Sequence, residues 1–134
     1  MSYTMARTEH IFRNYVRNRE HYDKHKTYIA DSVLSRDPTV SPVMSVGCHK
    51  QPQLAVVIAW ENSPSLGRME EAIEFVENAM LYIEQRSPRT YTVMLLRYMV
   101  GMSSREISEM LGISGGAVRR RLRYGIKLAE RSGR

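Results

Sequence analysis

Apolar residues recur with the period of an α-helix along most of the chain, and the clearest case is residues 65–86. The apolar positions there step by four, three, four and three residues, at Met69, Ile73, Val76, Met80 and Ile83. Glutamates occupy other faces, which is typical of an amphipathic helix. The pattern fits a helix packed on its own domain and also a dimer seam, because two heptads do not establish a coiled coil. The acidic surface is either a protein-docking face or simply a solvated one.

A thinner stripe predicts a long helix over residues 5–34, a segment without Pro or Gly. Its apolar positions are Ile11, Tyr15, Tyr22, Ile29 and Val33. A stripe this narrow cannot bury a helix by itself, so the helix should pack on the rest of the chain or on a second copy. Residues 5–34 and residues 65–86 are therefore the two candidate surfaces for a homodimer.

Between these two helices the periodic pattern is interrupted. Residues 35–53 contain three Pro, one Gly and several Ser, which predicts a linker. Residues 53–61 form an apolar run that fits a buried strand or a short buried helix, and the helical context favours the helix. Ser63 followed by Pro64 is a cap with a proline at the first helical position, which marks the start of the next helix.

A second cap and proline, Ser87 and Pro88, precede a predicted helix over residues 89–100. The side chains directed inward should be those of Val93, Leu96 and either Met99 or Tyr98. Gly101 should end this helix. Past the last helix, residues 127–134 show no packing pattern beyond Leu128, and we expect them to form a basic tail.

Residues 103–125 contain two short helix patterns separated by a glycine turn. Ser103 and Glu106 have the spacing of a capping box, in which hydroxyl and carboxylate satisfy two free backbone N–H groups. Gly112 suits the left-handed position that ends a helix, because it has no Cβ to clash. Ser114 can cap the second helix. Cap, helix, glycine turn, cap and basic helix together predict a helix-turn-helix.

The second of these helices has one apolar side. Val118 and Leu122 are four residues apart, so both should pack against the first helix. Their expected partners there are Ile107 and Leu111. Arg121 lies close to this buried side, and its candidate partners are Glu106 and Glu109.

The arginines on the other faces of this helix are candidates for DNA contacts. Arg119 and Arg120 are best placed to reach base edges, and Arg123, one turn later, to meet a phosphate. Gly115 and Gly116 weaken the helix relative to alanine, so they either allow phosphate to approach free N–H groups or ease a tight turn. The predicted DNA-binding residues are Ser103, Ser104, Arg105, Ser114, Gly115, Gly116, Arg119, Arg120 and Arg123.

The charge distribution supports a nucleic-acid partner. The formal net charge is +6, and residues 87–134 alone carry ten Lys and Arg against three Glu, or +7. Residues 61–86 carry −4, so the basic charge is concentrated at the predicted helix-turn-helix. Sixteen of the twenty cations are Arg, the side chain that can bind phosphate or guanine through two nitrogens. These features predict double-stranded DNA as the partner.

Other function classes find little support in the sequence. A single cysteine, Cys48, excludes an internal disulfide framework and agrees with a reducing cytoplasm. Cys48 and His49, taken with His21 and His25, lack the spacing of zinc ligands, so we expect no metal or cofactor. No run approaches the about 20 apolar residues of a membrane span, and no signal peptide is evident. No catalytic constellation is present, so an enzyme is not expected.

Residues 88–131 resemble the helix-turn-helix of sigma-70 region 4. The matching positions are Leu96-Arg97-Tyr98, Gly101, Ser103, Glu106-Ile107, Leu111-Gly112-Ile113-Ser114, Val118 and Arg121-Leu122. Three departures from the family pattern stand out: Ser108 replaces a usual alanine, Ala117 replaces a common threonine, and Gly115-Gly116 replace residues that often contact DNA. The resemblance implies an all-α DNA-binding module that many regulators share.

The whole layout resembles the ArpU/RinA-type regulators of phage late genes. It consists of an N-terminal helical segment (1–34), a linker with a short apolar element (35–63) and a DNA-binding domain (64–134). The resemblance implies a sequence-specific, cytoplasmic activator of a late promoter that also contacts host RNA polymerase. The alternative is a small terminase-type DNA-packaging subunit, although those proteins usually carry the module at the N-terminus and form large rings.

Overall fold

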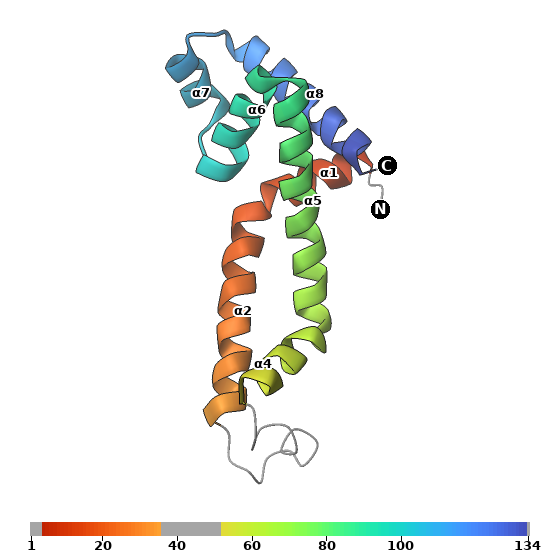
Figure 1. Cartoon of the computed structure of the whole chain (residues 1–134). Helices are drawn as coiled ribbons and strands as arrows, with labels where there is room; N and C mark the ends of the chain where they lie inside the picture. Colours follow the sequence, from red (N-terminus) through yellow and green to blue (C-terminus); the bar gives the residue numbers. More distant parts are fainter. Residues whose placement is uncertain (1–3, 36–51, 134) are drawn as a thin grey trace. The chain divides into compact units, whose positions relative to one another are not determined.

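The computed structural model describes residues 4–35 and 52–133, and the regular elements within these ranges are all helices (Figure 1). The all-α prediction is confirmed, and the ambiguous apolar run forms a helix. The elements are α1 (Met5–Arg13), α2 (Tyr15–Ser35), α4 (Pro52–Glu61), α5 (Pro64–Arg86), α6 (Pro88–Met94), the π-helical segment η1 (Leu95–Val100), α7 (Ser104–Leu111) and α8 (Gly115–Ser132). None of the helices in these ranges is both long and apolar enough to cross a membrane.

Contacts divide the chain into two compact units. The larger unit consists of Met1–Arg17 together with Ala72–Arg134, and the smaller unit of Asn18–Glu71. Helices α2 and α5 each contribute to both units. The domain limits predicted from the sequence, 1–34, 35–63 and 64–134, do not coincide with the limits of these two units. They stay a prediction.

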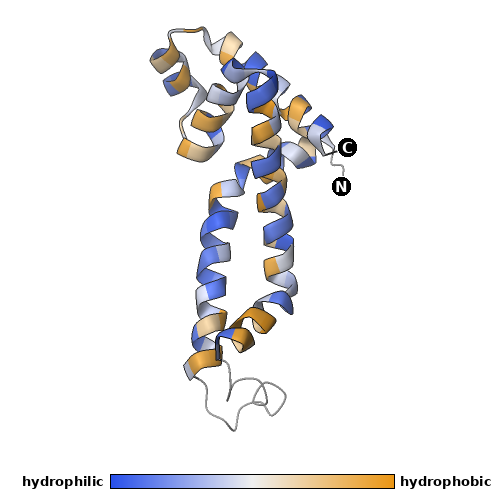
Figure 2. Cartoon of the chain, viewed as in Figure 1, coloured by the Kyte–Doolittle hydropathy of each residue, from blue (hydrophilic) through white to orange (hydrophobic). Residues whose placement is uncertain are grey.

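The core of the larger unit joins α1 to α5, α6, η1 and α8. Phe12 of α1 is fully buried at its centre. Its ring lies edge-on to the rings of Phe75 and Tyr98, with centroids 6.5 and 5.5 Å away. The stripe predicted on α5 is confirmed, because Ile73, Val76, Met80 and Ile83 are buried. Figure 2 shows the alternation of hydrophobic and hydrophilic residues along α5 and α8 that such packing requires.

The predicted continuous helix over residues 5–34 is wrong at Asn14, where α1 ends before α2 begins. The Asn14 side-chain amide donates to the His10 carbonyl at 2.9 Å, and its backbone N–H donates to the same carbonyl at 3.1 Å. Asparagine side chains compete in this way with the helical hydrogen-bond ladder. Helix α1 packs on the core of its own unit through Ile11 and Phe12.

The predicted basic tail is also wrong. Helix α8 continues to Ser132, and both Leu128 and Ala129 are buried in the core of the larger unit. Ala129 lies seven residues after Leu122 and three residues after Ile126, so it is on the same buried side of α8. A small alanine gives a weak sequence signal, so this last part of the buried side was missed.

The smaller unit has a cluster of three buried apolar residues, Val33, Ala55 and Val56, and Leu66 is buried as well. Polar contacts support this cluster at Trp60. The Trp60 indole N–H donates to the Lys26 carbonyl at 3.0 Å, and the Lys26 ammonium lies 4.1 Å from the centre of the Trp60 ring.

Candidate nucleic-acid interface

The entry into α7 is held by the predicted cap at Ser103. Its hydroxyl oxygen accepts the Glu106 backbone N–H at 3.2 Å, and the hydroxyl donates to the Glu106 carboxylate at 3.1 Å. The carboxylate half of the capping box therefore acts on the Ser103 hydroxyl, where the sequence predicted a backbone N–H. The helix start is as predicted, and it places Ser104 in the first turn of α7.

The turn between α7 and α8 depends on Gly112 and Ser108. Gly112 has a φ of 65°, the left-handed conformation that glycine adopts without strain. The Ile113 N–H donates to the Ser108 carbonyl at 3.2 Å, while the Ser108 hydroxyl donates to the Ile113 carbonyl. Ser108 is one of the departures from the family pattern, and here its side chain holds the turn.

Ser114 caps α8, since its hydroxyl oxygen accepts the Ala117 N–H at 3.1 Å. Gly115 and Gly116 are the first two residues of α8. Neither has a positive φ, which among the described glycines occurs at Gly101 and Gly112. The idea that the two glycines ease a tight turn is therefore wrong: Gly112 makes that turn. A Cβ on Gly115 or Gly116 would meet nearby guanidinium nitrogens at ordinary contact distances of 3.6 and 3.8 Å.

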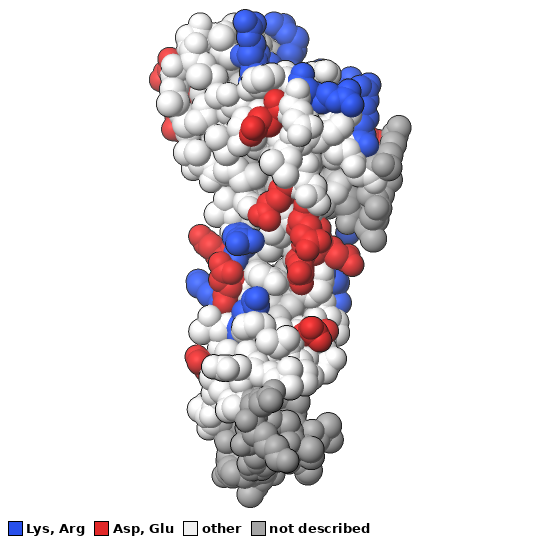
Figure 3. Space-filling model, viewed as in Figure 1, with Lys and Arg blue, Asp and Glu red and all other residues white. Residues whose placement is uncertain are grey.

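The apolar side of the helix-turn-helix is confirmed. Ile107 and Val118 are fully buried against each other and against Val93 of α6. The partly buried side chains packed on this cluster are Leu96, Met102, Leu111, Ile113 and Leu122. This packing leaves Arg119, Arg120 and Arg123 exposed. Figure 3 shows Lys and Arg gathered over α8.

The predicted partners of Arg121 have other contacts. Glu106 binds Ser103, and Glu109 lies 3.6 Å from Arg105. Arg105 and Glu109 have side chains 89% and 71% exposed, so their pairing is weak. Arg105 can therefore exchange Glu109 for a phosphate at little cost.

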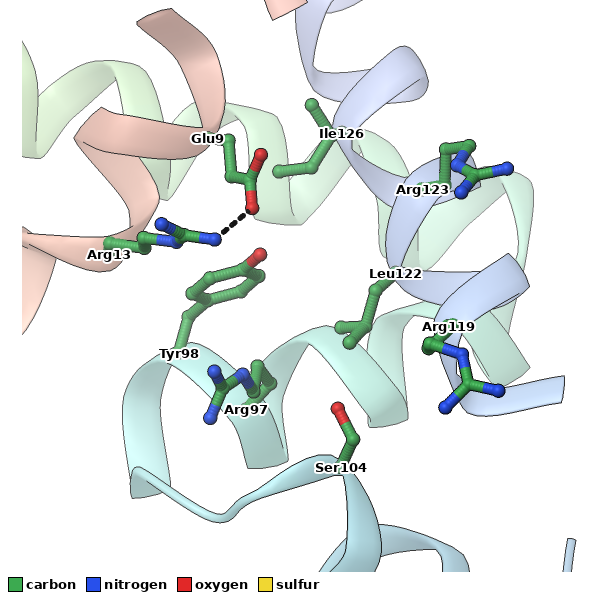
Figure 4. Close-up of a pocket in the computed structure, with 9 residues that line it drawn as sticks. All are labelled: Glu9, Arg13, Arg97, Tyr98, Ser104, Arg119, Leu122, Arg123 and Ile126. Atoms are coloured by element: carbon green, nitrogen blue, oxygen red, sulfur yellow. Dashed lines mark hydrogen bonds and ion pairs between the residues drawn. The ribbon is translucent and has the colours of Figure 1, made fainter. Parts of the chain in front are cut away.

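A groove of about 350 Å³ lies between α1, η1, α7 and α8 (Figure 4). Three predicted DNA-binding residues line it: Ser104, Arg119 and Arg123. The other lining residues are Glu9, Arg13, Arg97, Tyr98, Leu122 and Ile126. The remaining predicted DNA-binding residues do not line this groove; they are Ser103, Arg105, Ser114, Gly115, Gly116 and Arg120. Arg119 and Arg120 are adjacent in the sequence, but of the two only Arg119 lines the groove.

Arg97 and Arg13 are groove residues that sequence reasoning missed. Arg97 lies in the π-helical segment, and its guanidinium donates to the Met102 carbonyl at 3.1 Å. Arg97 belongs to the Leu96-Arg97-Tyr98 motif that matches the family pattern, but no role was predicted for it from the sequence. Arg13 carried no signal, because only tertiary packing brings α1 to this place.

The Tyr98 hydroxyl lies beside these charges (Figure 4). Burial raises the pKa of Tyr98 above its ordinary value, and the Glu9 carboxylate raises it further, while Arg13 and Arg97 act in the opposite direction. At neutral pH this phenol keeps its proton and is a hydrogen-bond donor.

No three His, Cys, Asp or Glu side chains come together as metal ligands in the described ranges. His21 and His25 lie on α2, whereas Cys48 and His49 are outside those ranges. The expectation of no metal site at these residues stays a prediction.

Comparison with known proteins identifies the module. A family model, sigma-70, region 4, matches residues 79–127, which run from the second half of α5 through most of α8. No curated protein and no solved structure matches the chain. Residues 79–127 are thus similar to the sigma-70 region 4 helix-turn-helix, a fold of DNA-binding regulators.

Proposed function

We propose that the chain is a sequence-specific transcription regulator that inserts α8 into the major groove of DNA. The observation that carries this proposal is the geometry of α8. One side of the helix is buried through Val118, while three arginines on its other faces are exposed. A recognition helix needs this arrangement, since its packed side sets its orientation and its exposed side chains reach the bases.

The contacts divide by position along α8. Arg119 and Arg120 belong to its N-terminal half and read base edges, whereas Arg123 lies one turn later and binds phosphate. At the helix start, Ser114, Gly115 and Gly116 approach a phosphate through backbone N–H groups. The phosphate contacts from α7 are those of Ser103, Ser104 and Arg105.

The resemblance to ArpU/RinA-type regulators extends this proposal. It makes the chain a phage- or prophage-encoded activator of late genes that acts in the cytoplasm of a bacterial host and contacts RNA polymerase. An apolar groove of about 300 Å³ offers a surface for that contact, and it is lined by Glu77, Met80, Leu81, Tyr91, Leu95 and Met99. Leu81 supports this choice, because its side chain is 61% exposed.

A homodimer is part of the same proposal. Helix α2 exposes Tyr28 and Leu34, which are 68% and 59% exposed, and α5 exposes Leu81. Helix α2 lies in a segment that the hydrophobic pattern selected for self-association, whereas the stripe that selected α5 is buried in its own unit, and Leu81 lies outside that stripe. The mass of the chain in solution tests this: a dimer supports regulation, a monomer contradicts the dimer, and a ring of eight or more copies supports the packaging alternative.

The double substitution Arg119→Ala plus Arg120→Ala tests DNA reading. Genomic fragments bound by the chain are mapped for the wild type, for this variant and for a control, Lys127→Ala plus Arg131→Ala. The control removes the same charge from exposed positions near the other end of α8. We expect promoter sites to be lost only in the first variant. Promoter sites retained in it, or a single site near a packaging locus in the wild type, would contradict the proposal.

A further inference from the structure

The groove of Figure 4 contains more positive charge than the helix-turn-helix alone supplies. Four arginines line it: Arg13 from α1, Arg97 from η1, and Arg119 and Arg123 from α8. One carboxylate, that of Glu9, lies among them. The lining therefore carries a formal charge of +3, which favours an anionic ligand.

We propose that this groove binds a phosphate group and that α1 thereby adds a contact to the DNA interface. This inference rests on the proposed function for its main source of phosphate, the DNA backbone. Arg13 lies outside the residues that match the region 4 family, so the contact would belong to this chain's own N-terminal helix.

The groove has the chemistry of a phosphate site. Guanidinium groups form charge-assisted hydrogen bonds with phosphate oxygens, often through two nitrogens at once. The hydroxyls of Ser104 and Tyr98 point into the groove in Figure 4, and both can donate hydrogen bonds to such oxygens. Arg97 is held in place by its bond to the Met102 carbonyl. The volume of about 350 Å³ accommodates a phosphate with part of its sugar or its water shell.

Arg119 and Arg123 place this site beside the recognition helix. They are four residues apart on α8, so both project from one side of it. Both residues line the groove, and in Figure 4 their exposed guanidinium groups point outward, away from Arg13 and Tyr98. A DNA strand that follows the start of α8 therefore passes the mouth of the groove. This proximity favours a backbone phosphate over a free anion as the ligand.

Glu9 acts as an internal competitor for this ligand. Its carboxylate lies 2.6 Å from the Arg13 guanidinium, and the two side chains are 43% and 64% exposed. A phosphate that binds Arg13 must displace this carboxylate, which is inexpensive because exposed ion pairs are weak. Removal of the Glu9 charge should therefore strengthen phosphate binding.

The first arm of the test measures DNA affinity of the full chain at several salt concentrations. Arg13→Gln is compared with Arg7→Gln, which removes the same charge from an exposed position on the same helix that does not line the groove. We expect Arg13→Gln to weaken binding about tenfold. The slope of log affinity against log salt should fall by about 0.9, the value for one lost phosphate contact. Arg7→Gln should keep the wild-type slope, and Glu9→Gln should bind DNA more tightly than wild type.

The second arm uses inorganic pyrophosphate in place of DNA and follows the side-chain NMR signals of Arg13 and Arg97. Shifts of both signals in wild type and an unshifted Arg97 signal in Arg13→Gln, with no specific effect of Arg13→Gln on DNA, identify a free phosphate compound as the ligand. Identical DNA binding by the Arg13 and Arg7 variants, without pyrophosphate shifts, overturns the proposal. The proposed function survives that result if Arg119→Ala plus Arg120→Ala still abolishes promoter binding.

Discussion

The larger and the smaller unit bury their apolar side chains to different degrees. The largest fully buried side chains of the described residues all belong to the larger unit, with Phe12, Ile83 and Met94 among them. Among the described residues of the smaller unit only four apolar side chains are buried, while Leu54, Val57 and Ile58 of α4 are 40–49% exposed. The difference indicates that stability resides mainly in the unit with the DNA-binding module, and that α1 helps to provide it.

The largest expected effect comes from Phe12→Ala. This substitution empties the centre of the larger core and should lower the free energy of unfolding by about 3–5 kcal/mol. Val56→Ala, in the smaller core, removes fewer atoms and should cost about 1–2 kcal/mol. Chemical denaturation measures both values. Equal costs for the two variants would contradict the difference between the units.

Alanine substitutions at two glycines, one in each unit, should change the free energy of unfolding in opposite directions and by less than Phe12→Ala does. A Cβ on Gly125 would lie 2.5 Å from the sulfur of Met94, which is fully buried, so the Met94 side chain would have to shift within the core. Gly125→Ala should therefore cost about 1–2 kcal/mol net of its gain in helix propensity. Gly67 lies on α5 in the smaller unit with no atom within 4 Å of such a Cβ, so Gly67→Ala should stabilise by about 1 kcal/mol. Thermal unfolding distinguishes the two signs, and stabilisation by both variants would refute the close packing of α6 on α8.

The smallest effect concerns pH. Burial, followed by the Glu9 carboxylate, raises the pKa of Tyr98 above 10.0. The neutral phenol is favoured in the folded state, so its contribution to stability is present below pH 10 and is lost as the pH rises through the folded-state pKa. Tyr98→Phe should flatten the alkaline loss of unfolding free energy. Tyr28→Phe, at an exposed position of the smaller unit, serves as the control, and equal alkaline slopes for Tyr98→Phe and wild type would rule out this contribution.

Local chemistry in the sequence was sufficient to predict most helix limits and the helix-turn-helix. The caps at Ser87, Ser103 and Ser114 are all confirmed, as are the helix end at Gly101 and the left-handed conformation of Gly112. These features depend on a side chain and backbone groups within a few residues of it, so the sequence alone determines them. The missed break at Asn14 is local as well, but asparagine interrupts a helix less reliably than proline or glycine.

Contacts between distant segments were decided only by the tertiary structure. Phe12 gave no sign of a central place in the core, because its burial depends on Phe75 and Tyr98, far along the chain. The same packing brings Arg13 to Arg97, Arg119 and Arg123, and so creates the groove that the proposed phosphate site requires. The sequence by itself determined a basic helix behind a glycine turn. Which other charges join that helix depends on long-range packing, which periodicity and capping patterns do not encode.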